Sequence, residues 1–242
     1  MYKIDAPTQL IEQVYDAILN AICSGALPPN EKITQEGLAE TLGVSRQPIL
    51  QAFQLLKRQG FIEESGRKGV MVTAIDPLRL LQLYQVRSVM DGLAARETAV
   101  RWAQQARQAK EDAADDAGLG PAQGRALIVE GRATANADDL NHRILADMNF
   151  HQFIYRASGN PVIAETTAIH WHHIRRAMGA ILSNDVRSHV AVWDEHEAIL
   201  DAIIAGKAAL ADKLAREHAE SAADHLAKVL MQQQYASKRR QA

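Results

Sequence analysis

The chain has 242 residues, of which 47% are hydrophobic and 23% are charged, and its formal net charge is −2. This balance is ordinary for a folded globular protein, and the length suffices for two modest domains, each with its own core. It excludes a uniformly basic protein that coats nucleic acid. The sequence contains no apolar run of membrane-spanning length, no signal-peptide core at its N-terminus, and a single cysteine, Cys23. We therefore expect a cytoplasmic protein that does not enter the membrane.

An amphipathic helix is predicted over residues 8–24. Its apolar side chains recur on one side of the helix, at Leu10, Ile11, Val14, Ile18 and Ile22. Gly25 and the pair Pro28–Pro29 end it.

Residues 34–60, TQEGLAETLGVSRQPILQAFQLLKRQG, have the pattern of a helix-turn-helix. Thr34 can cap a short first helix, and Gly43 can end it. Ser45 can cap a second helix, where Pro48 in the first turn loses no needed hydrogen bond. The apolar residues of that second helix recur at i, i+3, i+4 and i+7, namely Ile49, Ala52, Phe53 and Leu56. This spacing buries one face and leaves the opposite face to solvent.

The solvent face of the second helix carries side chains that suit phosphates and base edges in a DNA major groove. They are Arg46, Gln47, Leu50, Gln51, Gln54 and Lys57. Two short strands predicted at 61–64 and 70–72 enclose a loop with glycines and cations, as in a wing that lies along phosphates. Thr34, Ser45, Arg67, Lys68 and Gly69 complete the predicted DNA-binding set. Five cations and two acidic residues between 45 and 70 leave a local charge of +3. A helical hairpin within a larger protein is the alternative, but the cap, turn, apolar pattern and wing all favour DNA binding.

After Asp76–Pro77 the strand signals vanish and alanine- and leucine-rich segments with helical spacing follow. Helices are predicted at 77–108, 122–132, 137–158, 161–182, 185–205 and 207–234. Glycine, proline, serine and asparagine mark the breaks between them, and residues 111–120 are expected to form a loop. The expected fold class is mainly α, with a winged helix-turn-helix domain at 1–75 and an all-α helical bundle at 76–236. A basic tail at 237–242 is expected to be disordered.

Four polar residues on three of these predicted helices are candidates for a metal site. Asp147 and His151 are four residues apart, which puts both side chains on one helix face. His196 and His218 lie on two later helices, and all four could converge in the bundle core. One carboxylate and three imidazoles suit zinc, nickel, manganese or iron. Because a helical histidine is more often a packed or surface group, the spacing alone leaves both interpretations open.

The remaining histidines stand outside this set. They are His142, His170, His172, His173, His189 and His225. Those around Trp171 either line the same cavity or lie at a helix surface.

The order of these two domains resembles the GntR family of transcription regulators. The segment LAETLGVSRQPILQAFQLLKRQGFIEE is similar to that family's signature around the turn and recognition helix. The second half resembles the FCD branch, whose effector domain is an antiparallel helical bundle. The matching segments are YQVRSVMDGLAAR, DMNFHQFIYRASGN and EHEAILDAI, followed by His218. The resemblance covers about residues 8 to 232.

In that branch an aspartate and three histidines at matching positions often bind a divalent metal. The resemblance therefore implies Asp147, His151, His196 and His218 as metal ligands, with zinc the expected ion and nickel, manganese or iron as alternatives. It also implies that a small organic acid binds the metal through its carboxylate.

Arg87 matches an arginine that commonly faces the same cavity, so the resemblance implies that it binds the effector or holds Asp147. The alternative for Arg87 is a buried ion pair with a carboxylate such as Asp91. Asn160 is the second candidate effector-binding residue, and a role at a helix end is its alternative.

Three departures from the family pattern stand in the DNA-binding half. Leu50 replaces an arginine that is a main base reader, and Gln51 replaces a glutamate. Leu50 offers only apolar contact, for instance to a thymine methyl group, so the operator sequence is not implied. Asn30 stands where a glycine is usual.

The resemblance implies a ligand-responsive, sequence-specific transcription regulator, expected to be a repressor that binds a near-palindromic operator as a homodimer. The competing hypotheses are a metal-dependent hydrolase on an all-α scaffold and a dimerisation module without a ligand. Glu195 and Glu197 flank His196, but neighbouring residues on a helix point to different faces. No nucleophile motif or phosphate-binding glycine loop occurs in the sequence, so we do not expect an enzyme.

Overall fold

A computed structural model of the chain describes residues 8–66, 69–108, 119–134, 140–181 and 189–241. The chain divides into two compact units, Met1–Ile75 and Asp76–Ala242. None of the described helices is long and apolar enough to cross a membrane.

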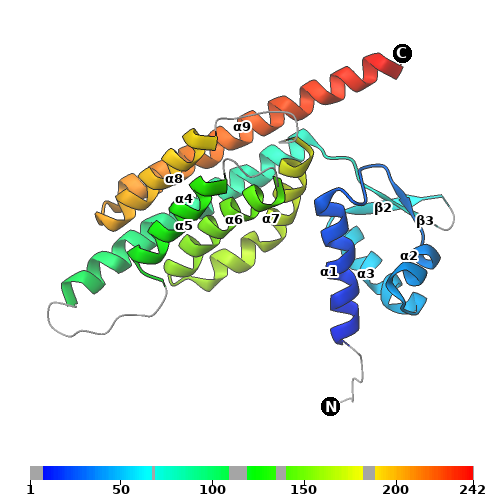
Figure 1. Ribbon diagram of the computed structural model, residues 1–242, viewed down its shortest axis with the longest axis horizontal. Coiled ribbons are helices and arrows are strands. Elements are labelled where there is room, and N and C mark those ends of the chain that lie inside the picture. Colours follow the sequence, from blue (N-terminus) through cyan, green and yellow to red (C-terminus); the bar gives the residue numbers. More distant parts are fainter. Residues whose placement is uncertain (1–7, 67–68, 109–118, 135–139, 182–188, 242) are drawn as a thin grey trace. The chain divides into compact units, whose positions relative to one another are not determined.

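The first unit is a winged helix of three helices and a small sheet (Figure 1). Its elements are α1 (Thr8–Ser24), β1 (Lys32–Ile33), α2 (Gln35–Leu42), α3 (Arg46–Arg58), β2 (Ile62–Ser65) and β3 (Gly69–Val72). The sheet is antiparallel, with β3 between β1 and β2. The sequence did not predict β1, because two residues are too short to show an alternating pattern.

The apolar pattern of α3 buries the residues that the sequence placed inside. Ile49, Ala52 and Leu56 have no exposed surface, and Phe53 is 4% exposed. They pack against α1, whose Ile18 and Ile22 are buried as well. One face of α3 is thereby fixed to the core, and the other is left to solvent.

The turn between α2 and α3 has the predicted capping residues, with one difference. The Thr34 hydroxyl accepts a hydrogen bond from the Gly37 N–H at 3.1 Å, and Gly43 ends α2 in the left-handed conformation at φ 65°. Ser45 occupies the N-cap position of α3, but its side chain makes no capping hydrogen bond. The prediction of Ser45 as a capping side chain is therefore wrong, although its backbone is extended as an N-cap requires.

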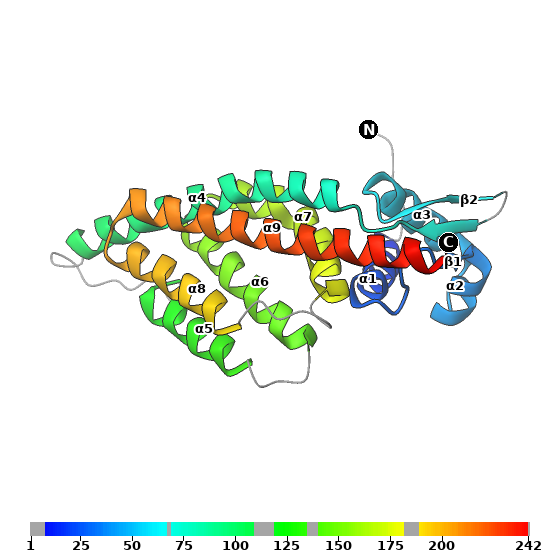
Figure 2. The ribbon, with the colours of Figure 1, turned by 90° about the horizontal axis from the view of Figure 1, so that it is seen from above.

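The second unit is a helical bundle (Figures 1 and 2). Its helices are α4 (Pro77–Gln108), α5 (Pro121–Ala133), α6 (Leu140–Ala157), α7 (Pro161–Ile181), α8 (His189–Ile204) and α9 (Ala208–Gln241). The long helices α4 and α9 lie side by side in both views and form the most extensive packing of the unit. Helix α6 packs on α4, α5 and α7, and α8 packs on α4, α5 and α9. The polar residues of α4, α6, α8 and α9 can therefore meet inside the bundle.

The C-terminal segment corrects one expectation from the sequence. Helix α9 continues to Gln241, whereas a disordered tail was expected at 237–242. No glycine or proline follows Gly206, and the segment is rich in alanine, glutamine, lysine and arginine. These residues are good helix formers, so nothing local ends the helix. The predicted loop at 111–118 and the predicted helical starts at 137–139 and 185–188 lie outside the described residues.

A glycine sets the distance between α5 and α8. A Cβ atom on Gly131 would lie only 1.9–2.3 Å from ring atoms of Trp193. The absence of a side chain at Gly131 lets the Trp193 ring pack closely, and that ring is 1% exposed. Trp193 also contacts the Phe150 and His196 rings edge to face, with centroids 6.2 and 4.7 Å away. The close approach at Gly131 thus helps to place His196.

Asn30 adopts a left-handed conformation, with φ 68°, which glycine adopts more readily than residues with a side chain. Its side chain is exposed, so substitutions there change mainly the backbone energy.

We expect Asn30→Val to lower the free energy of unfolding of the first unit by about 1–2 kcal/mol, and Asn30→Gly to leave it equal or higher. Urea unfolding followed by circular dichroism measures both. Equal stability of the two variants would contradict the role of φ.

Candidate functional site

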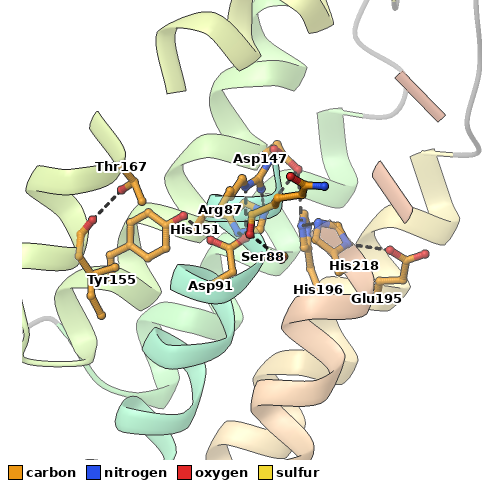
Figure 3. Close-up of polar contacts among 12 residues, drawn as sticks. Arg87, Ser88, Asp91, Asp147, His151, Tyr155, Thr167, Glu195, His196 and His218 are labelled. Atoms are coloured by element: carbon orange, nitrogen blue, oxygen red, sulfur yellow. Dashed lines mark hydrogen bonds and ion pairs between the residues drawn. The ribbon is translucent and has the colours of Figure 1, made fainter. Parts of the chain in front are cut away.

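Asp147, His151, His196 and His218 converge inside the bundle, with one ligand atom from each lying within 4.8 Å of the others (Figure 3). His196 Nε2 lies 3.1 Å from His218 Nε2 and 3.5 Å from Asp147 Oδ1. His151 Nε2 lies 4.0 Å from the same Asp147 oxygen. The three histidines are buried, and Asp147 is 13% exposed. Helices α6, α8 and α9 supply the four side chains.

This donor set fits a divalent metal. Zinc ligands at 2.0–2.2 Å from the ion lie about 3–3.5 Å from one another in tetrahedral geometry, close to the shorter separations found here. Two imidazole nitrogens that face each other at 3.1 Å repel when both carry lone pairs, and a shared cation removes that repulsion. Asp147, His151, His196 and His218 are therefore the described residues that could hold a metal.

Two carboxylates stand behind the histidines and orient them. Glu195 Oε2 lies 2.7 Å from His218 Nδ1, and Asp91 Oδ2 lies 3.4 Å from His151 Nδ1. Each carboxylate favours a proton on Nδ1, which leaves Nε2 as the electron-pair donor toward the cluster. The sequence predicted only that Glu195 and His196 point to different faces of their helix. It did not predict the contact of Glu195 with His218, which forms because α9 packs on α8.

Arg87 lies at the edge of the cluster, on α4. Its Nε donates to Asp91 Oδ2 at 3.2 Å, and its Nη2 lies 2.8 Å from His151 Nε2. The guanidinium also lies over the Trp171 ring, 4.1 Å from the centroid. The buried ion pair with Asp91, which was the alternative to effector binding, is thus present. Arg87 also lines the adjacent cavity, so the pair and a contact with a ligand are compatible.

The protonation states of the buried groups suit metal binding. Burial lowers the pKa of His151 well below its ordinary value, and the nearby charge of Arg87 lowers it further. His151 is therefore neutral at pH 7 and keeps a lone pair for a ligand bond. Burial raises the pKa of Tyr84 to about 12, so its phenol stays protonated and can donate a hydrogen bond into the cavity.

A cavity of about 80 Å³ adjoins the cluster. Asp147 and His218 line one part of it, together with Arg87 and Tyr84. Apolar side chains, among them Ile144, Met178, Val192 and Leu226, cover much of the remaining wall. A ligand in this cavity can reach the cluster and Arg87 at the same time.

The residues that line the cavity differ from those that the sequence predicted at the effector site. The Asn160 side chain accepts a hydrogen bond from the Val162 N–H at 3.2 Å, so it caps α7 and is not among the residues that line this cavity. His225 does line the cavity, although the sequence left it outside the site. Arg143 also lines it and was missed. The signal that could have found Arg143 is its position four residues before Asp147, on the same helix face.

The predicted DNA-binding residues of α3 share an accessible face. Arg46, Gln47, Gln54 and Lys57 are exposed, Leu50 is 43% exposed, and Gln51 is half-buried. Gly69 begins β3 at the base of the wing, and Arg67 and Lys68 lie outside the described residues. The face therefore combines cations and amides around one exposed leucine, as expected for contact with a DNA groove.

Both described cations of this face form exposed ion pairs within the unit. Arg46 Nη2 pairs with Glu36 of α2, and Lys57 Nζ pairs with Glu64 of β2. Exposed pairs of this kind contribute only about 0–1 kcal/mol, so phosphates can replace the carboxylates at little cost.

The sequence matches two families that follow one another along the chain. Residues 10–72 match the gntR family of bacterial regulatory proteins, and residues 82–221 match the FCD domain. The chain belongs to the FCD branch of the GntR family. It is therefore a member of a family of DNA-binding transcription regulators, and its named relatives are regulators and not enzymes.

Relatives that align over most of the chain support this assignment to the GntR family. An uncharacterized HTH-type transcriptional regulator from an unstable DNA locus of Streptomyces ambofaciens is 27% identical over 216 residues, covering 89% of this chain and 84% of that protein. A probable D-xylose utilization operon transcriptional repressor of Paenarthrobacter nicotinovorans is 25% identical, covering 87% and 86%. The HTH-type regulator YdhC of Bacillus subtilis is 32% identical over a shorter stretch, 38% of this chain. That match spans 42% of YdhC, and the match to a regulator of Agrobacterium vitis spans 53% of that protein.

Solved structures of GntR regulators share the fold. Escherichia coli McbR/YncC has a TM-score of 0.72 and 18% identity, covering 93% of this chain and 98% of that one. A GntR transcriptional regulator from Rhodococcus sp. RHA1 has a TM-score of 0.69 and 19% identity, covering 89% and 96%. The fold class predicted from the sequence is confirmed.

The contact of Glu195 with His218 predicts an effect on metal affinity. We expect Glu195→Ala to weaken zinc binding by about 10–100-fold, because His218 loses the acceptor that orients its ring. Calorimetric titration of the chelator-treated protein with zinc measures the change. Glu220→Ala, an exposed glutamate on the same helix as His218, is the control. Unchanged zinc affinity in Glu195→Ala would show that the hydrogen bond does not support the site.

The exposed face of α3 predicts the effect of losing Arg46. We expect Arg46→Ala to weaken binding to a DNA fragment selected from random sequence by about 1–3 kcal/mol, because a charged donor to the groove is removed. Fluorescence anisotropy at fixed salt measures the affinity. Glu36→Gln is the matched control, since it removes the intramolecular partner of Arg46 and should leave affinity equal or tighter. Equal affinity of Arg46→Ala and the wild type would rule out this contact.

Proposed function

We propose that this GntR-family regulator is a repressor whose helical unit binds a divalent metal and, through it, a small organic acid. The observation that carries the proposal is the convergence of Asp147 with three buried histidines within 4.8 Å, beside a cavity lined by Arg87. Zinc is the expected ion, and nickel, manganese and iron suit the same ligands. The repressor role is supported by the relative described as a probable repressor of a D-xylose operon.

Asp147, His151, His196 and His218 would hold the metal. When bound, a divalent ion with an open position supplies a positive centre that a carboxylate can coordinate. Asp147 and His218 line the cavity, so this positive centre would be accessible to a ligand there. Glu195 contacts Nδ1 of His218, on the side of the ring away from the cluster, and so orients a ligand instead of acting as a general base in the cavity.

Arg87 would provide the second contact to the same carboxylate. His151 Nε2 has one lone pair, so it cannot ligate a metal and accept a hydrogen bond from Arg87 Nη2 together. Once Nε2 serves as a ligand, Arg87 Nη2 is available to a carboxylate in the cavity, while Arg87 Nε remains on Asp91. Metal binding would thereby free Arg87 Nη2 to donate a hydrogen bond to the effector carboxylate.

Regulation would follow from the linkage between the two units. We infer a homodimer that places two copies of α3 on a near-palindromic operator. An effector that prefers one arrangement of the winged helices changes DNA affinity by no more than its differential affinity for the two arrangements. DNA must change effector affinity by the same factor, which gives the proposal a thermodynamic check.

Thermal unfolding tests the metal and acid site directly. We expect zinc to stabilise the chelator-treated protein and one of a panel of small carboxylic acids to stabilise the zinc form further, because both bind only the folded state. A ligand at 100 times its dissociation constant adds about 2.7 kcal/mol. His196→Ala should lose both effects, because it removes a metal ligand from the centre of the cluster.

His142→Ala is the matched control, since His142 is exposed on α6 and outside the cluster. Its response to zinc should equal that of the wild type, and both variants should keep the circular dichroism of a folded helical protein. Full zinc content in His196→Ala, or no response of the wild type to zinc or to the other three metals, would refute the metal site and favour a dimerisation module without a ligand.

A further inference from the structure

Arg143 is a second arginine in the wall of the cavity, and the proposed metal–carboxylate contact does not use it. It lies on α6, one turn before Asp147, and lines the same cavity. Its Nε atom is buried and has no hydrogen-bond partner. Within the part of the chain that the structure describes, Arg143 forms neither a hydrogen bond nor an ion pair.

Several other arginines of the helical unit pair with carboxylates, and Arg101 and Arg175 donate to a carbonyl and to an amide oxygen. Arg87 pairs with Asp91, Arg125 with Asp201, and Arg216 with Asp212. Desolvating a guanidinium N–H without an acceptor costs free energy, so buried donors in native proteins are generally satisfied. Because Arg143 stands at a cavity wall, a ligand in the cavity is the natural source of the missing acceptor.

The charges around the cavity distinguish a monoanion from a dianion. The carboxylate of Asp91 offsets Arg87, and the carboxylate of Asp147 offsets half the charge of a divalent ion. One positive charge of the ion and the positive charge of Arg143 then remain without a compensating carboxylate of the protein. Glu195 lies behind His218 and is 37% exposed, so solvent screens its contribution. Two positive charges in one small cavity match two carboxylates.

The spacing and the volume match a short molecule. Arg143 and Asp147 are four residues apart on α6, which separates them by about 6 Å along the helix axis. This is comparable to the distance between the two carboxylates of a dicarboxylate with a chain of four carbons. At about 10–15 Å³ for each water-sized group, a volume of about 80 Å³ admits roughly five to eight such groups. Apolar side chains of Ile144 and Val192 line the cavity and suit the methylene groups.

We propose that Arg143 binds a second carboxylate of the effector, which makes the effector a short dicarboxylate. This inference rests on the proposed metal site, because the first carboxylate is bound there and by Arg87. The second carboxylate accepts hydrogen bonds from the Arg143 guanidinium, whose planar donor set fits it in a bidentate manner. Arg143 is then the residue that makes the protein bind dicarboxylates more tightly than monocarboxylates of the same length.

Succinate and butyrate test the proposal, since they differ mainly in the second carboxylate. We expect zinc-loaded wild-type protein, freed of excess zinc, to bind succinate about 10–100-fold more tightly than butyrate in calorimetric titrations. Arg143→Gln, which keeps the length of much of the side chain but removes its charge, should reduce this ratio to about one while butyrate affinity stays the same. Arg143→Lys should restore part of the preference.

Arg156→Gln is the control, because Arg156 is exposed on the same helix and does not line the cavity. It should bind both acids as the wild type does, and all variants should retain zinc. Equal binding of succinate and butyrate by the wild type would leave the proposed metal–carboxylate site intact and overturn the role of Arg143. So would an Arg143→Gln variant that loses both acids equally. Binding of neither acid would overturn both proposals.

Discussion

The buried ion pair between Arg87 and Asp91 constrains the whole polar centre of the helical unit. Both side chains are almost fully buried, so each needs partners for its remaining polar atoms. Asp91 accepts a hydrogen bond from the Tyr155 hydroxyl, and Arg87 contacts His151 and stacks on the Trp171 ring. Removing one member of such a pair typically costs about 3–5 kcal/mol, because the other charge is left without compensation. The pair therefore holds α4, α6 and α7 in one register.

That register places the histidines between two layers of carboxylates. Asp91 lies behind His151 and Glu195 lies behind His218, while Asp147 faces the Nε2 atoms. Carboxylates that accept from Nδ1 raise the basicity of the opposite nitrogen and fix the ring orientation. The cluster is thereby preorganised for a cation, and the cavity beside it places arginines where anionic groups of a ligand can bind. Structural stability and ligand recognition thus depend on the same buried charges.

The charged side chains of the DNA-binding unit are exposed, in contrast to the buried ion pair of the helical unit. Arg46 and Lys57 are exposed, and their ion pairs with Glu36 and Glu64 are open to solvent. Such pairs are weak and screened by salt, so they hold the side chains near the groove-facing surface without competing strongly with phosphate. Leu50 stands among them as an exposed apolar group where the family usually has an arginine. We therefore expect base selection to differ from that of regulators with an arginine at this position, because Leu50 offers only apolar contact.

The sequence by itself determined the order of elements, because helices, turns and caps are local. The 3.6-residue period predicted the bounds of α1 and α4, Thr34 predicted the start of α2, and the spacing of Asp147 and His151 placed them on one helix face. The helix positions of the other two histidines left their convergence with this pair open, the family resemblance favoured it, and the packing of the helices brings the four side chains together. Glu195 shows the limit: it points to a different face from its neighbour His196, as local geometry requires, yet it contacts His218 because α9 packs on α8. Likewise, the proposed role of Arg143 could not be predicted from the sequence. Whether an arginine lines a cavity and has a hydrogen-bond partner depends on side chains that are distant in the chain.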